Sequence, residues 1–245
     1  SELRAVGVDF SFAPVLDLRT SESTVIGERA FHRNSSIVSR LAQSYVAGMR
    51  AAGVSAIGKH FPGHGSVVKD SHRELPIDER DFYDISRTDL LPFRTLINAG
   101  IEGVMTAHVK YPKVDNCVAT YSEIWIKKIL RQDMHFEGAV FSDDLSMAGA
   151  MTEGDHLNRV HKALACGCDM LLICNDRQIV KDVLAKLEDN VNPLAGARLM
   201  RMHSRGKKVD REILRNSSRW LHVSNRIAGG NHCPELDLND RNTLR

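Results

Sequence analysis

The feature that most constrains this chain is its series of short apolar runs, which alternate with amphipathic stretches. The runs are continuously apolar, which is typical of parallel strands covered on both faces, whereas a strand with one wet face alternates apolar and polar residues. Five of them are predicted to be strands: Val8–Val15, Val54–Lys59, Gly103–Ala107, Gly138–Phe141 and Met170–Cys174. Strands that alternate with helices predict an α/β fold, with a parallel sheet and helices outside it.

Helical spacing fills the segments between and after these runs. One predicted helix is capped by Ser36 and ends at Gly53, and another begins at Ser122. Two more, Asp176–Leu187 and Asp210–Val223, each open with an acidic residue that can cap the first turn. The apolar residues predicted to face inward from the first two helices are Ile37, Leu41, Val46, Met49, Ile126, Ile129 and Leu130.

The charge balance and the length of the apolar runs argue against several classes of protein. Lys and Arg number 33 against 31 Asp and Glu, a net charge of +2, so no nucleic-acid partner is expected. No run approaches the roughly 18–20 apolar residues that span a bilayer, and the first residues lack the layout of a signal peptide. Five cysteines, a small and odd number, predict a reducing cytoplasm rather than a disulfide scaffold.

Polar residues follow each predicted strand at the point where it ends. The carboxyl ends of parallel strands meet on one face, where barrels and open α/β sheets build their active sites. Some of these residues could simply cap the next helix, which is the favoured interpretation for Asp176 and an open one for Asp17. The strand-end residues are Asp17, Lys59, His60, His108, Asp143, Asp144, Asn175 and Asp176.

The densest polar stretch is Lys59–Gly65, which is followed closely by Asp70-Ser71-His72. Its histidines raise the possibility of a metal site, but they lie on a Gly/Pro-rich loop rather than at helical spacing, and no Cys pair accompanies them. The alternative is acid–base chemistry, because Asp70 and His72 are close enough in sequence to pair. A carboxylate beside an imidazole favours its protonated form and fixes its tautomer, which suits proton delivery near neutral pH.

The Lys59–Gly65 stretch (Lys-His-Phe-Pro-Gly-His-Gly) with Asp70-Ser71-His72 resembles glycoside hydrolase family 3. Within that family it is similar to the bacterial β-N-acetylhexosaminidases of cell-wall recycling, because the Asp-Ser-His loop separates that branch from the β-glucosidases. The resemblance extends to about Arg226, and its further matches are Phe12–Asp17, Ile26–Phe31 and Phe141–Met147.

The resemblance implies a role for each matched residue. Asp143 matches the nucleophile that forms a covalent glycosyl-enzyme, His72 matches the general acid/base, and Asp70 matches the partner that orients it. Asp144 is expected to be a cap or a supporting group. Arg29, Lys59 and His60 match sugar-binding positions, whereas Asp17, His64 and His108 are expected to shape the site without reacting. No cofactor and no metal ion is implied.

The resemblance also implies a (β/α)8 TIM barrel, which needs eight strands and roughly 250 residues. The family's acidic sugar-binding residue and its Glu-Gly-Gly-Arg stretch precede Phe10, and neither is present here. We therefore expect the N-terminal strands of the barrel to be missing from this chain, which would expose Ile37, Leu41 and Val46 and leave the chain inactive. Residues 1–228 are predicted to form this incomplete catalytic domain, and 229–245 a flexible polar tail.

The resemblance, with the cytoplasm expected from the few cysteines, implies a cytoplasmic exo-β-N-acetylglucosaminidase. It would remove terminal N-acetylglucosamine from anhydro-muropeptides. The carbohydrate substrate is its expected partner, and no binding to nucleic acid or to a membrane is expected. We expect a monomer at full length. Two alternatives stay open: a metal-dependent barrel hydrolase that uses His60, His64 and Asp143, and an inactive truncated relative of the family.

Overall fold

The computed structural model describes residues 1–245 except 21–22, 24, 188–191, 205, 207–209 and 230–245. The predicted tail at 229–245 therefore lies outside the described residues apart from Gly229, and the predicted domain boundary stays a prediction. Of the helices in the described part of the chain, none combines the length and the apolar character that crossing a bilayer requires.

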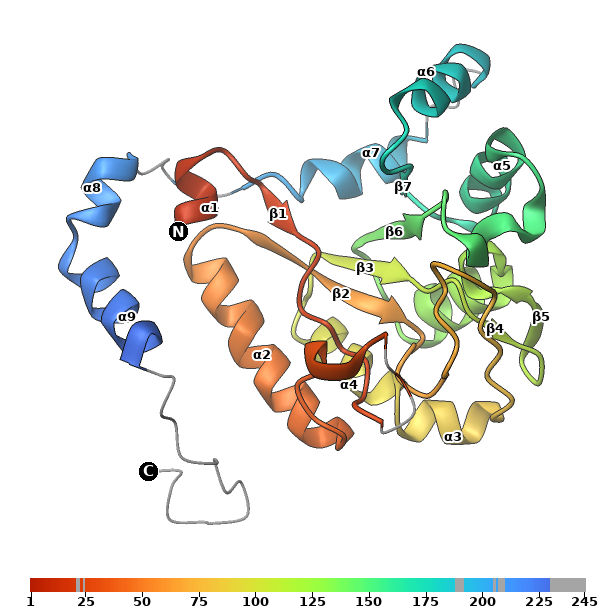
Figure 1. Ribbon diagram of the computed structural model, residues 1–245, viewed down its shortest axis with the longest axis horizontal. Coiled ribbons are helices and arrows are strands. Elements are labelled where there is room, and N and C mark those ends of the chain that lie inside the picture. The colour runs from red at the N-terminus through yellow and green to blue at the C-terminus, as the bar shows by residue number, and fades with distance from the viewer. Residues whose placement is uncertain (21–22, 24, 188–191, 205, 207–209, 230–245) are drawn as a thin grey trace.

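The described strands form one five-stranded parallel sheet, in the order β1-β2-β3-β6-β7, and a separate hairpin of β4 and β5 (Figure 1). Each strand of the sheet pairs with the one before it, so the sheet is wound in a single direction. This is the winding of a barrel wall, because a doubly wound sheet reverses its strand order part-way. The bounds are β1 Phe10–Ser11, β2 Ser55–Phe61, β3 Gly103–Thr106, β4 Lys110–Tyr111, β5 Asp115–Val118, β6 Ala139–Asp144 and β7 Met170–Leu172.

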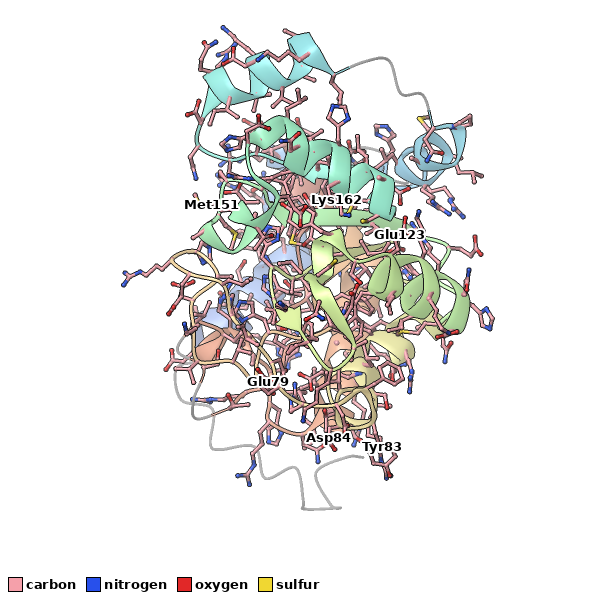
Figure 2. The ribbon with its side chains drawn as sticks, turned by 90° about the vertical axis from the view of Figure 1, so that its right-hand side faces the viewer. Glu79, Tyr83, Asp84, Glu123, Met151 and Lys162 are labelled. Atoms are coloured by element: carbon pink, nitrogen blue, oxygen red, sulfur yellow. The ribbon has the colours of Figure 1, made fainter. Side chains whose placement is uncertain are left out.

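Helices connect the strands and cover one face of the sheet. Helix α2 links β1 to β2, α3 and α4 link β2 to β3, η3 links β3 to β6, and α5 links β6 to β7. Figure 2 shows the molecule from the side, with Lys162 on α5 and Glu123 at the start of η3. The bounds are α1 Glu2–Ala5, η1 Gly27–Arg29, α2 Ser35–Ala51, α3 Phe82–Arg87, α4 Leu90–Asn98, η2 Ala119–Tyr121, η3 Ile124–Asp133, η4 Ala148–Glu153, α5 His156–Cys166, α6 Arg177–Lys186, α7 Pro193–Met200, α8 Arg211–Arg215 and α9 Ser218–Gly229.

The two faces of the sheet have different cores. Successive side chains of a strand point to opposite faces, so Ala56 of β2 packs into the large outer core beneath the helices. Its neighbour Ile57 belongs to a small inner cluster, which also contains Met105, Ala139, Phe141 and Met202. Met202 follows α7, so a segment distant in sequence covers the inner face. The alternation then places Lys59 and Asp143 on this inner face, beyond Ile57 and Phe141.

The predicted strands are correct in position, but the first is shorter than expected. Only Phe10–Ser11 forms regular ladder, because Pro14 has no N–H to donate. Pairing with β2 nevertheless continues along the run, since the carbonyl oxygen of Pro14 accepts from the Lys59 N–H at 3.1 Å and the carbonyl oxygen of Lys59 accepts from the Leu16 N–H at 2.6 Å. The hairpin of β4 and β5 was not predicted from the sequence.

Helix α2 differs from its prediction at both its start and its buried face. Asn34, not Ser36, is the cap, and its side chain accepts from the N–H groups of Ser36 and Ile37. The buried stripe contains Val38, Ala42 and Val46. Leu41 is 37% exposed, which contradicts the inward orientation predicted from its spacing but agrees with the exposure expected of the truncated chain. Val46, which was also expected to be exposed, is buried.

The predicted helix Asp210–Val223 is in fact two helices, α8 and α9. The first helix ends at Asn216. The Ser217 hydroxyl then accepts from the Trp220 N–H and caps the start of the second helix. Asp210 and Asp176 do cap α8 and α6, as predicted. Helices α8 and α9 lie at the side of the sheet away from α5 (Figure 1).

Candidate active site

Asp143 lies at the carboxyl end of β6, with its side chain 18% exposed. One carboxylate oxygen accepts from the Asp144 N–H at 2.8 Å. The other lies 4.0 Å from His60 Nε2. Burial raises the pKa of Asp143, but the His60 and His108 imidazoles, the Asp144 N–H and the Lys59 ammonium together hold it below its ordinary value. Asp143 is therefore ionised at neutral pH, as a nucleophile must be.

Lys59 and His60 come from the end of β2 and lie beside Asp143. Burial lowers the pKa of Lys59, and the nearby Arg29 guanidinium lowers it further, while the carboxylates of Asp143 and Asp17 oppose both effects. The structure thus brings three of the predicted residues, Lys59, His60 and Asp143, into one electrostatic cluster. Arg29 is the outermost of the predicted sugar-binding residues, since it is exposed and donates to the carbonyl oxygen of Val25.

Asp17 is a buried carboxylate that organises the cluster without facing the substrate side. Its Oδ2 lies 2.7 Å from His60 Nδ1, and its Oδ1 accepts from the His64 N–H at 2.7 Å. Burial raises the pKa of Asp17, but His60 and His64 outweigh that effect and lower it overall. A carboxylate can only accept, so the proton of the neutral His60 ring lies on Nδ1. The other nitrogen, Nε2, is then free to face Asp143.

Asp70 and His72 form the pair that the sequence predicts. His72 Nδ1 lies 2.8 Å from Asp70 Oδ1, which also accepts from the His72 N–H at 2.9 Å. Burial raises the pKa of Asp70, but the hydrogen bonds from His72 and the charges of His72 and Arg73 together lower it overall. The His72 side chain is 61% exposed, so its second nitrogen is accessible from solvent.

Ser71, between these two residues, makes contacts that were not predicted from the sequence. It is only 2% exposed, and its hydroxyl lies 2.9 Å from His64 Nε2. Its carbonyl oxygen accepts from the N–H of Gly149, which follows β6 in the chain. The sequence does offer a signal for this contact: a small polar residue lies between the predicted acid/base His72 and its partner Asp70, seven residues after His64.

His108 and Asp144 are linked by a hydrogen bond at the carboxyl end of β6. His108 Nε2 donates to the Asp144 carbonyl oxygen at 3.0 Å, and its Nδ1 lies 3.0 Å from the Thr120 hydroxyl. Burial lowers the pKa of His108, so the ring is neutral at neutral pH. Asp144 accepts from the N–H groups of Ser146 and Cys174. These contacts fit the supporting roles expected for both residues.

The glycines of the Lys59–Gly65 stretch allow close packing. A Cβ on Gly65 would lie 2.0 Å from the Leu18 carbonyl oxygen, which only a glycine avoids. Gly63 has a φ of 150°, and its carbonyl oxygen accepts from the buried Tyr111 hydroxyl. The loop after β2 is thereby fixed on two sides.

The histidines of the predicted metal alternative make other contacts. His60 and His64 direct ring nitrogens at Asp17 and at Ser71. In the part of the chain that the structure describes, no group of three or more His, Cys, Asp or Glu side chains is arranged to hold a metal ion.

Comparison with known proteins places this arrangement in a family. Residues 1–206 match the model of the glycosyl hydrolase family 3 N terminal domain. The chain belongs to glycoside hydrolase family 3. A β-hexosaminidase from Thiobacillus denitrificans is 51% identical over 242 residues, and one from Nitrosospira multiformis is 47% identical over 239. The matches cover 98% and 97% of this chain but 67% and 68% of those relatives, so the chain spans about two thirds of their length.

Solved structures agree with the fold and with this branch of the family. NagZ from Neisseria gonorrhoeae, in complex with N-trifluoroacetyl-D-glucosamine, matches with a TM-score of 0.86 at 39% identity, over 93% of this chain and 66% of that one. A family 3 β-N-acetylglucosaminidase from Paenibacillus sp. str. FPU-7 matches with a TM-score of 0.80 at 29% identity, over 92% and 47%. The described sheet therefore corresponds to part of the barrel of a family 3 enzyme.

Proposed function

We propose that this chain carries the catalytic machinery of a retaining exo-β-N-acetylglucosaminidase. The observation that supports it best is an ionised carboxylate at a strand end, Asp143, combined with a separate Asp70–His72 pair on a loop. A hydrogen bond from the Gly149 N–H to the Ser71 carbonyl oxygen joins that loop to the segment after the strand. A nucleophile and a proton donor on different elements are what a two-step retaining mechanism requires. The relatives named β-hexosaminidase and the sugar bound to the Neisseria NagZ support the substrate class.

In the first step, Asp143 attacks the anomeric carbon while the bond to the leaving oxygen breaks. His72 gives its Nε2 proton to that oxygen, and Asp70 holds the opposite side of the ring through Nδ1. The products are a covalent glycosyl-enzyme and a free alcohol. Asp143 reacts well because it stays ionised next to Lys59.

In the second step, the same residues act in reverse. The Nε2 of His72, now unprotonated, takes a proton from water, and the water oxygen attacks the anomeric carbon. The bond between the sugar and Asp143 breaks and the carboxylate is restored. Two inversions at the same carbon give net retention of configuration.

Lys59, His60 and Arg29 are proposed to bind the sugar. The ammonium and guanidinium groups donate to hydroxyl or acyl oxygens and bring no acceptor of their own. His60 Nε2 faces the same space as Asp143, because Asp17 holds its Nδ1. For the substrate in the cell we propose anhydro-muropeptides with terminal N-acetylglucosamine, and thus a role in peptidoglycan recycling.

The direct test is the stereochemistry of hydrolysis. The gene product that contains this chain should hydrolyse a chromogenic β-N-acetylglucosaminide, and NMR of the first sugar formed should show the β-anomer. Release of the α-anomer would contradict the covalent mechanism. Activity that is lost on chelation would favour the metal-dependent alternative, and absence of any turnover the inactive one.

A further inference from the structure

The segment that carries Asp70 and His72 is held to the rest of the described fold through Ser71. In the described structure, the hydrogen bonds of Asp70 and His72 stay within residues 70–74. Of the three residues Asp70, Ser71 and His72, Ser71 is the one with hydrogen bonds that leave the segment: its hydroxyl contacts His64 Nε2 at 2.9 Å, and its carbonyl oxygen accepts from the Gly149 N–H at 2.9 Å. An exposed reacting pair thus flanks one buried anchor.

Asp17, the carboxylate that holds His60, also holds His64. The His64 backbone N–H donates to Asp17 Oδ1 at 2.7 Å, while His60 Nδ1 donates to Asp17 Oδ2. A continuous chain of contacts therefore runs from Ser71 through His64, Asp17 and His60 to Asp143. It joins the loop that bears the proton donor to the strand that bears the nucleophile.

We propose that His64 and Ser71 are positioning residues that set the placement of the acid/base pair over the nucleophile. This inference rests on the proposed function, because it concerns how that site delivers a proton. Neither residue reacts: His64 is buried, and Ser71 points its hydroxyl at His64 rather than at solvent.

The surroundings of the His64 ring make its hydrogen bond to Ser71 important for its orientation. Its Nδ1 is buried and has no hydrogen-bond partner in the described structure. Either neutral tautomer leaves Nδ1 without a partner, so in the described structure the ring is held through the contact of Nε2 with the Ser71 hydroxyl, in which one group donates and the other accepts. Burial lowers the pKa of His64, which favours the neutral ring, and either neutral tautomer can pair with the Ser71 hydroxyl.

Placement matters here because proton transfer requires the donor within hydrogen-bond reach of the leaving oxygen. A misplacement of about 1 Å at a reacting group can cost on the order of 10²-fold in rate. Loss of the tether should therefore harm the steps that need His72, but not the attack by Asp143 when the leaving group needs no proton. A residue that serves stability alone would affect both kinds of substrate equally.

The test compares two leaving groups in matched variants of the gene product that contains this chain. His64→Leu and Ser71→Ala each remove one partner of this hydrogen bond, and His64→Gln retains an amide group, which can donate or accept, near the position of Nε2. The two disruptive variants should lose on the order of 10–10²-fold in kcat/KM on a disaccharide with an alcohol leaving group. They should lose little on a 2,4-dinitrophenyl N-acetylglucosaminide, and His64→Gln should recover a large part of the disaccharide activity.

Ser39→Ala is the matched control, because Ser39 is a buried serine on α2 whose hydroxyl donates to the Ser35 carbonyl oxygen at 2.7 Å. It should lower kcat/KM on the two substrates by the same small factor. Equal losses on both substrates in Ser71→Ala and His64→Leu, with covalent labelling of Asp143 retained, would overturn the positioning role alone. Failure of the wild type to be labelled at Asp143 would overturn the proposed function and this inference with it.

Discussion

His60 Nδ1 lies 2.7 Å from Asp17 Oδ2, and this contact determines which nitrogen of His60 faces Asp143. The carboxylate holds the Nδ1 proton, so Nε2 is directed to the side of Asp143, 4.0 Å from its Oδ2. The same carboxylate accepts the His64 N–H. One buried group therefore orients residues on both sides of the site.

Asp17→Asn should weaken both folding and activity. The amide keeps one acceptor oxygen but places an N–H2 group against a donor, so at least one of the hydrogen bonds from His60 and His64 is lost. A hydrogen bond to a charged group contributes about 1.5–3 kcal/mol, and the free energy of unfolding at pH 7, measured in urea, should fall by that order. Unchanged stability together with unchanged kcat/KM would contradict the organising role of Asp17.

The pH dependence of this stability gap has a defined sign. The pKa of Asp17 is lower in the folded protein than its ordinary value of 3.8. Its contribution is therefore fully present above 3.8 and is lost as the pH falls through the folded value. The difference in unfolding free energy between wild type and Asp17→Asn should shrink as the pH falls below about 4, through the folded pKa of Asp17.

Asp143→Ala should abolish turnover of every substrate, whereas Asp144→Asn should leave most of it. The reason is that Asp143 supplies the attacking oxygen, while Asp144 accepts backbone bonds from Ser146 and Cys174. A 2-fluoro glycoside should label a peptide that contains Asp143, which mass spectrometry can identify. Label on Asp144 would show that the nucleophile is misassigned.

His72→Ala should cost roughly 10²–10⁴-fold with a poor leaving group, the usual range for general acid catalysis. With an activated phenolate the first step needs little protonation and should suffer much less. Asp70→Ala should show a milder form of the same pattern, because His72 would lose the partner of its Nδ1. Steady-state kinetics on the two substrates measure this, and equal losses on both would argue against His72 as the acid.

The sequence predicted the elements that local rules determine. The apolar runs located the strands, and the residues that follow them placed Lys59, His60 and Asp143 at one edge. The Asp70–His72 pair was predictable because two residues of separation suffice for the side chain of one to reach the ring of the other. The roles of these residues in catalysis remain predictions that the experiments above address.

Features that depend on three-dimensional contacts were missed. In α2 the largest apolar residues suggested Leu41 as a buried position, but the buried stripe includes the small Ala42, which permits close packing against the sheet. The contact between Ser71 and His64 depends on how the intervening loop folds back. The covering of the inner face by Met202 joins residues from opposite ends of the chain, which no local pattern can indicate.

Asp169→Ala should be among the most destabilising single changes in the described core. Its carboxylate is 2% exposed and lies 2.7 Å from Arg131 Nη2 and 3.0 Å from Arg198 Nη1, and it also accepts from the Val140 N–H. Removing it leaves the partly buried Arg131 without its counter-charge, and breaking a buried pair in this way costs about 3–5 kcal/mol. The loss should appear as a lower midpoint in urea.

Asp133→Ala is the matched control for this prediction. Asp133 pairs with Lys128 at 3.2 Å, but both side chains are exposed to solvent. An exposed pair contributes about 0–1 kcal/mol, because water screens the charges and two flexible side chains must be ordered. We therefore expect Asp133→Ala to leave the urea midpoint nearly unchanged. Similar losses in the two variants would mean that Asp169 does not depend on burial for its effect, and that the link from Arg198 on α7 to the strands β6 and β7 contributes little to the fold.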